Sequence, residues 1–299
     1  MRTKTNTPNP GGYAGQVVTK PPAWHTLVVF DVLFNNLTTG LFLVAVVGEL
    51  AFPAIFTPVC TWAYPIALAL LLIDLGTLVL DLGDKLRFHH MLRVFKPTSP
   101  MSLGTWCLTV YSFFLTAILA IEAVVLLGWL PADGIAWWAR KLLVAGGIPF
   151  CFGSAAYKGV LFSTTAQPGW KGARWLGAYL VNSALWLGTV QLLVIAALTG
   201  EGPAARLLAP AAGLLAVVNL IPLGLLANDL YPTLAALHPR SARVRAGVLV
   251  CLVGVVFPVG LLLLGSGVVI ACAVLVAVVS ANLGVRFVLI RLPHAASGH

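Results

Sequence analysis

Eight long apolar segments constrain the fold of this chain more than any other feature. A helix needs about 20 apolar residues to cross the hydrocarbon core of a membrane, and a helix satisfies its own backbone there. Hydrophobic residues make up 60% of the chain and charged residues only 9%, with a mean hydropathy of +0.97, which excludes an ordinary soluble domain. The sequence therefore predicts an all-α integral membrane protein with eight transmembrane helices. The expected spans are 27–49, 59–80, 102–127, 141–163, 175–198, 207–227, 246–264 and 268–289.

Basic residues are unevenly distributed between the two ends of these spans. With eight spans, both termini lie on one side, together with the loops that follow the second, fourth and sixth spans. The other side carries only Arg140, Lys141 and Arg206, and Lys158 lies within a span. By the positive-inside rule, both termini and the 81–104 loop are expected to be cytoplasmic. The first side carries Arg2, Lys4, Lys20, Lys85, Arg87, Arg93, Lys96, Lys171, Arg174, Arg240, Arg243, Arg245, Arg286 and Arg291.

Cysteines and histidines argue against a bound metal or haem in this chain. The five cysteines are scattered and form no CxxC pair, which does not favour a zinc site or an iron–sulfur cluster. None of the six histidines lies in the middle of an apolar span, where the axial ligands of a membrane haem are expected. We therefore expect no metal, no iron–sulfur cluster and no haem.

Ionisable side chains occur at membrane depth in the first four spans. Because successive spans run in opposite directions, Asp31, Asp74, Tyr157 and Lys158 all fall at a similar depth, nearer the cytoplasmic face. Asn35 lies about a turn deeper than Asp31. Buried charges are costly and mark functional sites by default, so these side chains are candidates to line one pocket. The structural alternative is that the aspartates and Lys158 only neutralise one another.

Two further acids, Glu49 and Glu122, lie near the opposite face. They are interpreted either as ordinary acids at helix ends or as the continuation of a proton route to that face. The last four spans hold almost no ionisable groups at depth, so we expect the chemistry in the first four. The polar residues of the last four spans are Asn182, Gln191, Asn219 and Asn282.

The loop Asp81–Gly104 is dense in polar residues and reads DLGDKLRFHHMLRVFKPTSPMSLG. It resembles the NrfD/polysulfide-reductase membrane-subunit family, whose members read like DLGRPxRFW…NPxSPMSWG between the second and third helices. This chain has Asp84-Lys85 where Arg-Pro is usual, and Leu103 where Trp is usual. LFNNLTTGLFL at 33–43 is similar to the family's first-helix pattern LFLGGLGAGLFL. YKGVL at 157–161 is similar to its fourth-helix pattern YxGxLL.

The resemblance implies two four-helix bundles, a first over 24–164 with a quinone site and a second over 165–292 that acts as scaffold or docks a partner. Flexible tails are expected at 1–23 and 293–299. The resemblance implies an exchangeable quinone or quinol and no redox centre in this chain. It also implies a bacterial inner-membrane complex with a ferredoxin-like iron–sulfur subunit and a molybdopterin or multihaem catalytic subunit. Many family members dock a periplasmic partner on the 81–104 face, whereas the charges here favour a cytoplasmic one.

The main hypothesis is a quinone-interacting subunit that exchanges electrons with the iron–sulfur partner. A proton-coupled transporter, built on Asp74 and Lys158, and a non-catalytic membrane anchor are the alternatives. The loop is expected to contact the partner subunit, or else anionic lipid headgroups. The predicted proton-handling residues are Asp31, Asp74 and Asp81; the predicted quinone-binding residues are Tyr157, Asp31, Lys158 and Asn35; the predicted docking residues are Lys85, Arg87, His89, Arg93 and Lys96.

Overall fold

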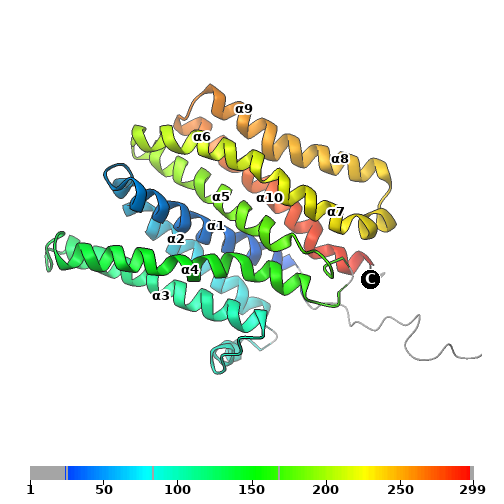
Figure 1. The fold of residues 1–299 in the computed structure, drawn as a ribbon, viewed down its shortest axis with the longest axis horizontal. Helices are drawn as coiled ribbons and strands as arrows, with labels where there is room; N and C mark the ends of the chain where they lie inside the picture. The colour runs from blue at the N-terminus through cyan, green and yellow to red at the C-terminus, as the bar shows by residue number, and fades with distance from the viewer. Residues whose placement is uncertain (1–23, 25, 83, 168, 297–299) are drawn as a thin grey trace, which may run out of the picture.

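The structure is a computed structural model that describes residues 24, 26–82, 84–167 and 169–296. The predicted tail 1–23 and residues 297–299 lie outside the described residues. Eight helices or helix pairs are long and apolar enough to cross a membrane, and the described part of the chain contains no strand. The predicted all-α membrane fold with eight transmembrane helices in two four-helix bundles is therefore confirmed (Figure 1). The helices are α1 (Thr26–Ala51), α2 (Pro53–Asp81), α3 (Pro100–Leu126), α4 (Ile135–Ser163), α5 (Leu176–Leu198), α6 (Gly202–Val218), α7 (Leu220–Leu237), α8 (Arg240–Cys251), α9 (Phe257–Leu264) and α10 (Val268–Ala296).

Helices α1 and α5 lie at the junction of the two bundles. In Figure 1, α2, α3 and α4 lie on one side of this junction, and α6 to α10 lie on the other. In α1 and in α5, 78% of the most apolar stretch is buried within the protein, against 11–33% in the other spans. Most of this stretch in the remaining spans is therefore at least partly exposed on the protein surface, while α1 and α5 pack among protein side chains.

Two glycines let α1 and α5 approach closely. A Cβ atom on Gly40 would lie only 2.6 Å from the carbonyl carbon of Ala184, and one on Gly188 only 2.6 Å from the backbone nitrogen of Leu41. In both cases the obstacle is backbone, which cannot move aside as a flexible side chain does. Small residues at such crossings are the usual means of packing membrane helices, because lipid supplies no hydrophobic driving force between them.

The sixth and seventh spans are interrupted at prolines. The sixth span is divided at Asn219 into α6 and α7, because Pro222 has no N–H to donate to the carbonyl of Val218. The seventh span contains a π-helical turn, η2 (Leu252–Val256), directly before Pro258. Such bulges accommodate a missing donor without ending the helix. Helix α4, by contrast, continues through Pro149.

Several helices extend beyond the apolar runs that predict them. Helices α2 and α4 begin at Pro53 and Ile135, six residues before the expected starts at 59 and 141, and α8 begins at Arg240 rather than 246. Helix α10 continues to Ala296, so residues 293–296 do not belong to a tail. Hydropathy marks only the part of a helix in hydrocarbon, whereas helical hydrogen bonding continues into the headgroup region.

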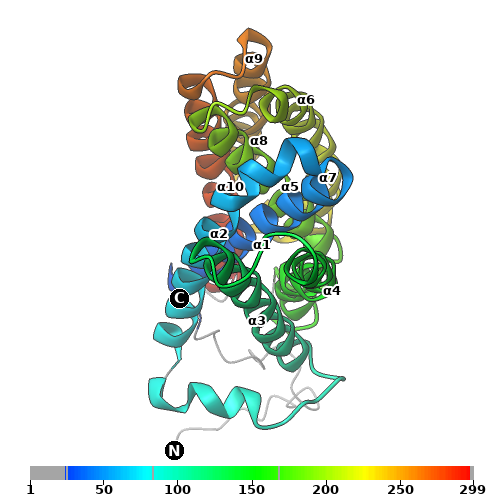
Figure 2. The ribbon, with the colours of Figure 1, turned by 90° about the vertical axis from the view of Figure 1, so that its left-hand side faces the viewer.

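The loop between α2 and α3 stands away from the bundles at one end of the molecule (Figure 2). It contains a short 3₁₀ helix, η1 (Lys85–Leu92), in which no residue is buried. The PTSPMS signal after it is the start of α3. Ser99 is the N-cap and accepts a hydrogen bond from the Ser102 backbone N–H at 3.4 Å, and Pro100 occupies the first helical position.

Candidate functional site

Lys158 is held between two aspartates inside the first bundle. Its Nζ lies 2.9 Å from Oδ1 of Asp31 and 3.5 Å from Oδ1 of Asp74, and it donates to the backbone carbonyl of Asp31 at 3.0 Å. The three side chains come from α4, α1 and α2, and each is at most 5% exposed. One ammonium thus faces two carboxylates in a low-dielectric interior, so the cluster is neutral only when it also holds one proton.

Asn35 joins this cluster from the next turn of α1. Its side-chain Nδ2 donates to Oδ2 of Asp74 and to Oγ of Ser154, both at 3.1 Å. Asn35 follows Asp31 by four residues, and Ser154 precedes Lys158 by four, so each pair lies on one face of its helix. The Oδ1 atom of Asn35 is buried and receives no hydrogen bond from the described residues. This acceptor is therefore unused within the part of the chain that the structure describes.

Tyr157 lies beside the cluster and packs on the end of the loop motif. It is 8% exposed, and the Lys158 Nζ lies 5.7 Å from the centre of its ring. The ring occupies the space where a Cβ on Gly104 would be, so only glycine fits there. Gly104 is the last residue of PTSPMSLG, and this contact links the motif to the buried cluster. The sequence singled out the motif without indicating this partner.

The structure does not bring Asp81 or the docking candidates into the cluster. Asp81 is the half-buried last residue of α2, seven residues and about 10 Å of helix beyond Asp74. In the loop, Arg87 pairs with Asp84 at 2.9 Å, and both side chains are more than half exposed. Such a pair contributes about 0–1 kcal/mol. All five docking candidates, Lys85, Arg87, His89, Arg93 and Lys96, are exposed.

A second ionic cluster ties the four helices together at the other end of the first bundle. Glu49 is fully buried and accepts hydrogen bonds from Arg140, from Lys141 at 2.9 Å and from the hydroxyl of Tyr64 at 2.7 Å. Arg140 also pairs with Glu122 at 2.8 Å. Both acids lie within the last five residues of their helices. The geometry favours the interpretation of Glu49 and Glu122 as acids at helix ends over a proton route, because each carboxylate already has a cationic partner.

Arg286 corrects the expectation that the last four spans hold almost no ionisable groups at depth. The charge distribution along the sequence groups it with the cytoplasmic basic residues, yet its side chain is fully buried in the second bundle. Its guanidinium donates to the backbone carbonyl and to Oδ1 of Asn282, and to Oγ of Ser183 at 3.0 Å. Hydropathy placed Arg286 at the end of an apolar run and could not show that α10 continues and turns this side chain inward. Without Arg286, the charge asymmetry is thirteen basic residues against three.

The fold and this site define a polytopic membrane protein with a buried lysine–carboxylate cluster in one of two four-helix bundles. The family model described as Polysulphide reductase, NrfD matches residues 17–293, nearly the whole chain. The chain therefore belongs to the NrfD family, as its loop motif indicated. Members are membrane subunits of quinone-linked oxidoreductase complexes, and this chain is a membrane subunit of that class. None of the curated protein sequences matches it.

Proposed function

We propose that this chain exchanges protons and electrons with a quinone at the loop-side end of its first bundle, and passes electrons to or from an iron–sulfur subunit docked on the 81–104 loop. The observation that carries the proposal is the buried cluster in which Lys158 is shared by Asp31 and Asp74, with Tyr157 beside it. A quinone that gains two electrons also gains two protons, so its site needs groups that supply protons inside the membrane.

The residues of the cluster fit such a ligand. The hydroxyl of Tyr157 is suited to donate a hydrogen bond to a quinone oxygen. The Oδ1 of Asn35, which accepts no hydrogen bond within the described residues, is suited to accept one from a quinol hydroxyl. Asp31 and Asp74 share one cation, so the pair takes up or releases a proton without leaving the cluster highly charged. Lys158 holds the two carboxylates in place during this exchange.

Asp81 extends this arrangement toward the loop. It lies at the end of α2, between the buried cluster and the exposed segment that carries Lys85 to Lys96. We assign it the role of proton relay between the cluster and the aqueous side. The loop is the surface for a ferredoxin-like iron–sulfur subunit, itself joined to a molybdopterin or multihaem catalytic subunit. In this proposal the loop faces the cytoplasm of a bacterial cell, because basic residues are concentrated there.

The test is the variant Tyr157→Phe in the intact complex, measured by binding of a quinone analogue and by quinol-linked electron transfer. Loss of one neutral hydrogen bond is expected to weaken analogue binding by about three- to tenfold and to slow electron transfer, with complex assembly unchanged. Tyr179→Phe is the matched control, because Tyr179 is a buried tyrosine of the second bundle. It is expected to bind the analogue like the wild type.

Three results would contradict the proposal. Wild-type analogue binding by Tyr157→Phe removes the tyrosine from the site. A complex that assembles with its iron–sulfur partner but binds no quinone analogue, even as wild type, identifies the chain as a membrane anchor. Membership in the NrfD family favours the redox subunit over the transporter, and solute flux in liposomes containing the purified chain would reverse that preference.

A further inference from the structure

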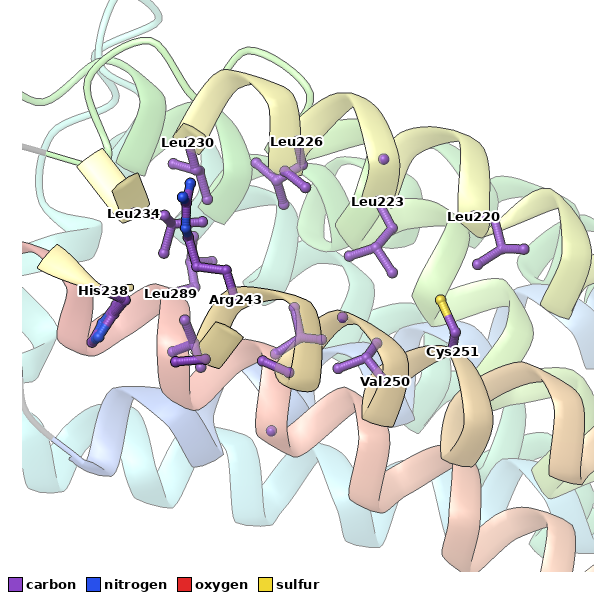
Figure 3. Close-up of a pocket in the computed structure, with 18 residues that line it drawn as sticks. Leu220, Leu223, Leu226, Leu230, Leu234, His238, Arg243, Val250, Cys251 and Leu289 are labelled. Atoms are coloured by element: carbon purple, nitrogen blue, oxygen red, sulfur yellow. The ribbon is translucent and has the colours of Figure 1, made fainter. Parts of the chain in front are cut away.

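The second bundle contains an apolar groove that the proposed quinone chemistry does not use. It lies between α7, α8 and α10, has a volume of about 580 Å³, and is lined mainly by aliphatic side chains such as Leu226, Leu230 and Leu289 (Figure 3). None of its lining residues belongs to the first bundle. Its size is that of a small-molecule site.

Glycines leave the groove open on each of its three helices. Gly224 of α7, Gly247 of α8 and Gly284 of α10 all line it, and a Cβ added to any of them would meet no atom within 4 Å. Ala246 and Gly247, two residues of α8 that line the groove, are themselves exposed. Since apolar residues exposed on a membrane helix face lipid, the groove is reached from the bilayer rather than from water.

One end of the groove is positively charged. Arg243 reaches from α8 toward Leu230 and Leu234 of α7, and His238 lies at the same end (Figure 3). The Arg243 guanidinium lies 4.8 Å from the ring centre of Tyr231, and its Nε atom is buried and has no hydrogen-bond acceptor among the described residues. Within the part of the chain that the structure describes, no lining residue is acidic.

We propose that this groove binds an anionic phospholipid, with an acyl chain along α7, α8 and α10 and the phosphate on Arg243. The apolar lining and the open glycine positions suit an acyl chain. The guanidinium supplies the charge and the unused donor that a phosphate oxygen would accept. Arg240 is exposed at the start of α8 and adds positive charge at the membrane surface. The site is independent of the proposed quinone function.

The test is lipid retention by the full chain, purified in mild detergent with its partner subunits and analysed by native mass spectrometry. The probes are phosphatidylglycerol and phosphatidylcholine with the same acyl chains. The wild type is expected to retain phosphatidylglycerol preferentially. Arg243→Ala is expected to retain about tenfold less of it, because a charge-assisted contact is lost. Arg245→Ala removes a charge from the same helix outside the groove and is expected to retain the lipid.

A second pair of variants tests the groove itself without altering its charge. Gly247→Phe places a ring in the open space and is expected to abolish retention. Gly260→Phe is the control, because Gly260 of α9 has equally open surroundings but does not line the groove. Equal retention of the two lipids by the wild type, or unchanged retention by both Arg243→Ala and Gly247→Phe, would overturn the proposal. So would a neutral lipid or a quinone that occupies the groove and is displaced by Gly247→Phe.

Discussion

Lys158 is a single ammonium shared by two buried carboxylates, and this stoichiometry decides what its loss would do. A buried ion pair adds little net stability, because desolvation offsets the attraction between the charges. Removing one partner is different, since the remaining charge is left in a medium that cannot solvate it. The cluster is therefore expected to be sensitive to the removal of Lys158 and much less sensitive to the removal of all three charges together.

Lys158→Met is expected to lower the stability of the purified chain by about 3–5 kcal/mol, because it leaves Asp31 and Asp74 close together without a cation. The measurement is the apparent midpoint of thermal unfolding in detergent. The triple variant that adds Asp31→Asn and Asp74→Asn is expected to recover most of this loss. Equal destabilisation of the single and triple variants would show that packing, and not charge, holds the three helices together here.

Gly104→Ala tests the contact between the loop motif and the tyrosine. The added methyl group occupies the position of the Tyr157 ring, so the ring must move and quinone-analogue binding is expected to fall at least severalfold. Gly76→Ala in α2 is the control, because a Cβ there meets nothing within 4 Å. If the two variants bind the analogue equally well, the position of Tyr157 does not matter for binding.

At the scale of elements, α1 connects the two bundles through consecutive side chains. Asn35 bonds to Asp74 and Ser154 in the first bundle, while Asn36 donates to the carbonyl of Leu180 at 2.7 Å and to Ser183 in the second. Neighbouring residues on a helix point about 100° apart. Asn35 and Asn36 therefore bond to different bundles although they are adjacent in the sequence. This arrangement is possible only because α1 is central and packed against α5.

Gly40→Ala is expected to destabilise the chain by about 1–3 kcal/mol, because its methyl group meets the backbone of α5 and forces α1 and α5 apart. The readout is again the apparent unfolding midpoint in detergent. Gly213→Ala in α6 is the matched control; its surroundings are open, and alanine has the higher helix propensity, so no loss is expected. A loss of the same size in both variants would remove the α1–α5 contact as the cause.

At the scale of the whole molecule, the basic residues gather at the end that carries the 81–104 loop and the charged end of the lipid groove. This asymmetry predicts the orientation in the membrane. It also predicts that the proposed partner surface and the proposed lipid phosphate lie on the same side, because the loops after the second and sixth spans share that side.

The orientation is tested by cysteine labelling in intact cells, after the exposed native residues Cys251 and Cys272 are replaced by serine. A membrane-impermeant maleimide is expected to label Asp133→Cys, in the α3–α4 connection, and to label His89→Cys only after the cells are opened. Both positions are exposed in the structure. Labelling of His89→Cys in intact cells would place the loop and its partner on the periplasmic side.

The sequence by itself determined the number of helices, the all-α membrane class and the depth of the ionisable side chains. Depth is a local property: about 20 apolar residues fix each span, and the alternating direction of the spans then places Asp31, Asp74 and Lys158 at one level. The sequence also indicated the family, because the Asp81–Gly104 motif is one continuous segment and can be recognised without knowing what packs against it.

The tertiary structure alone decided which faces of the helices meet. Hydropathy does not report rotation about a helix axis, so it placed Arg286 with the loop charges although that side chain points into the second bundle. The same limit applies to Gly40 and Gly104, whose importance depends on what packs opposite them. The apolar groove of the second bundle likewise depends on the tertiary structure, because it exists only where the open faces of α7, α8 and α10 come together.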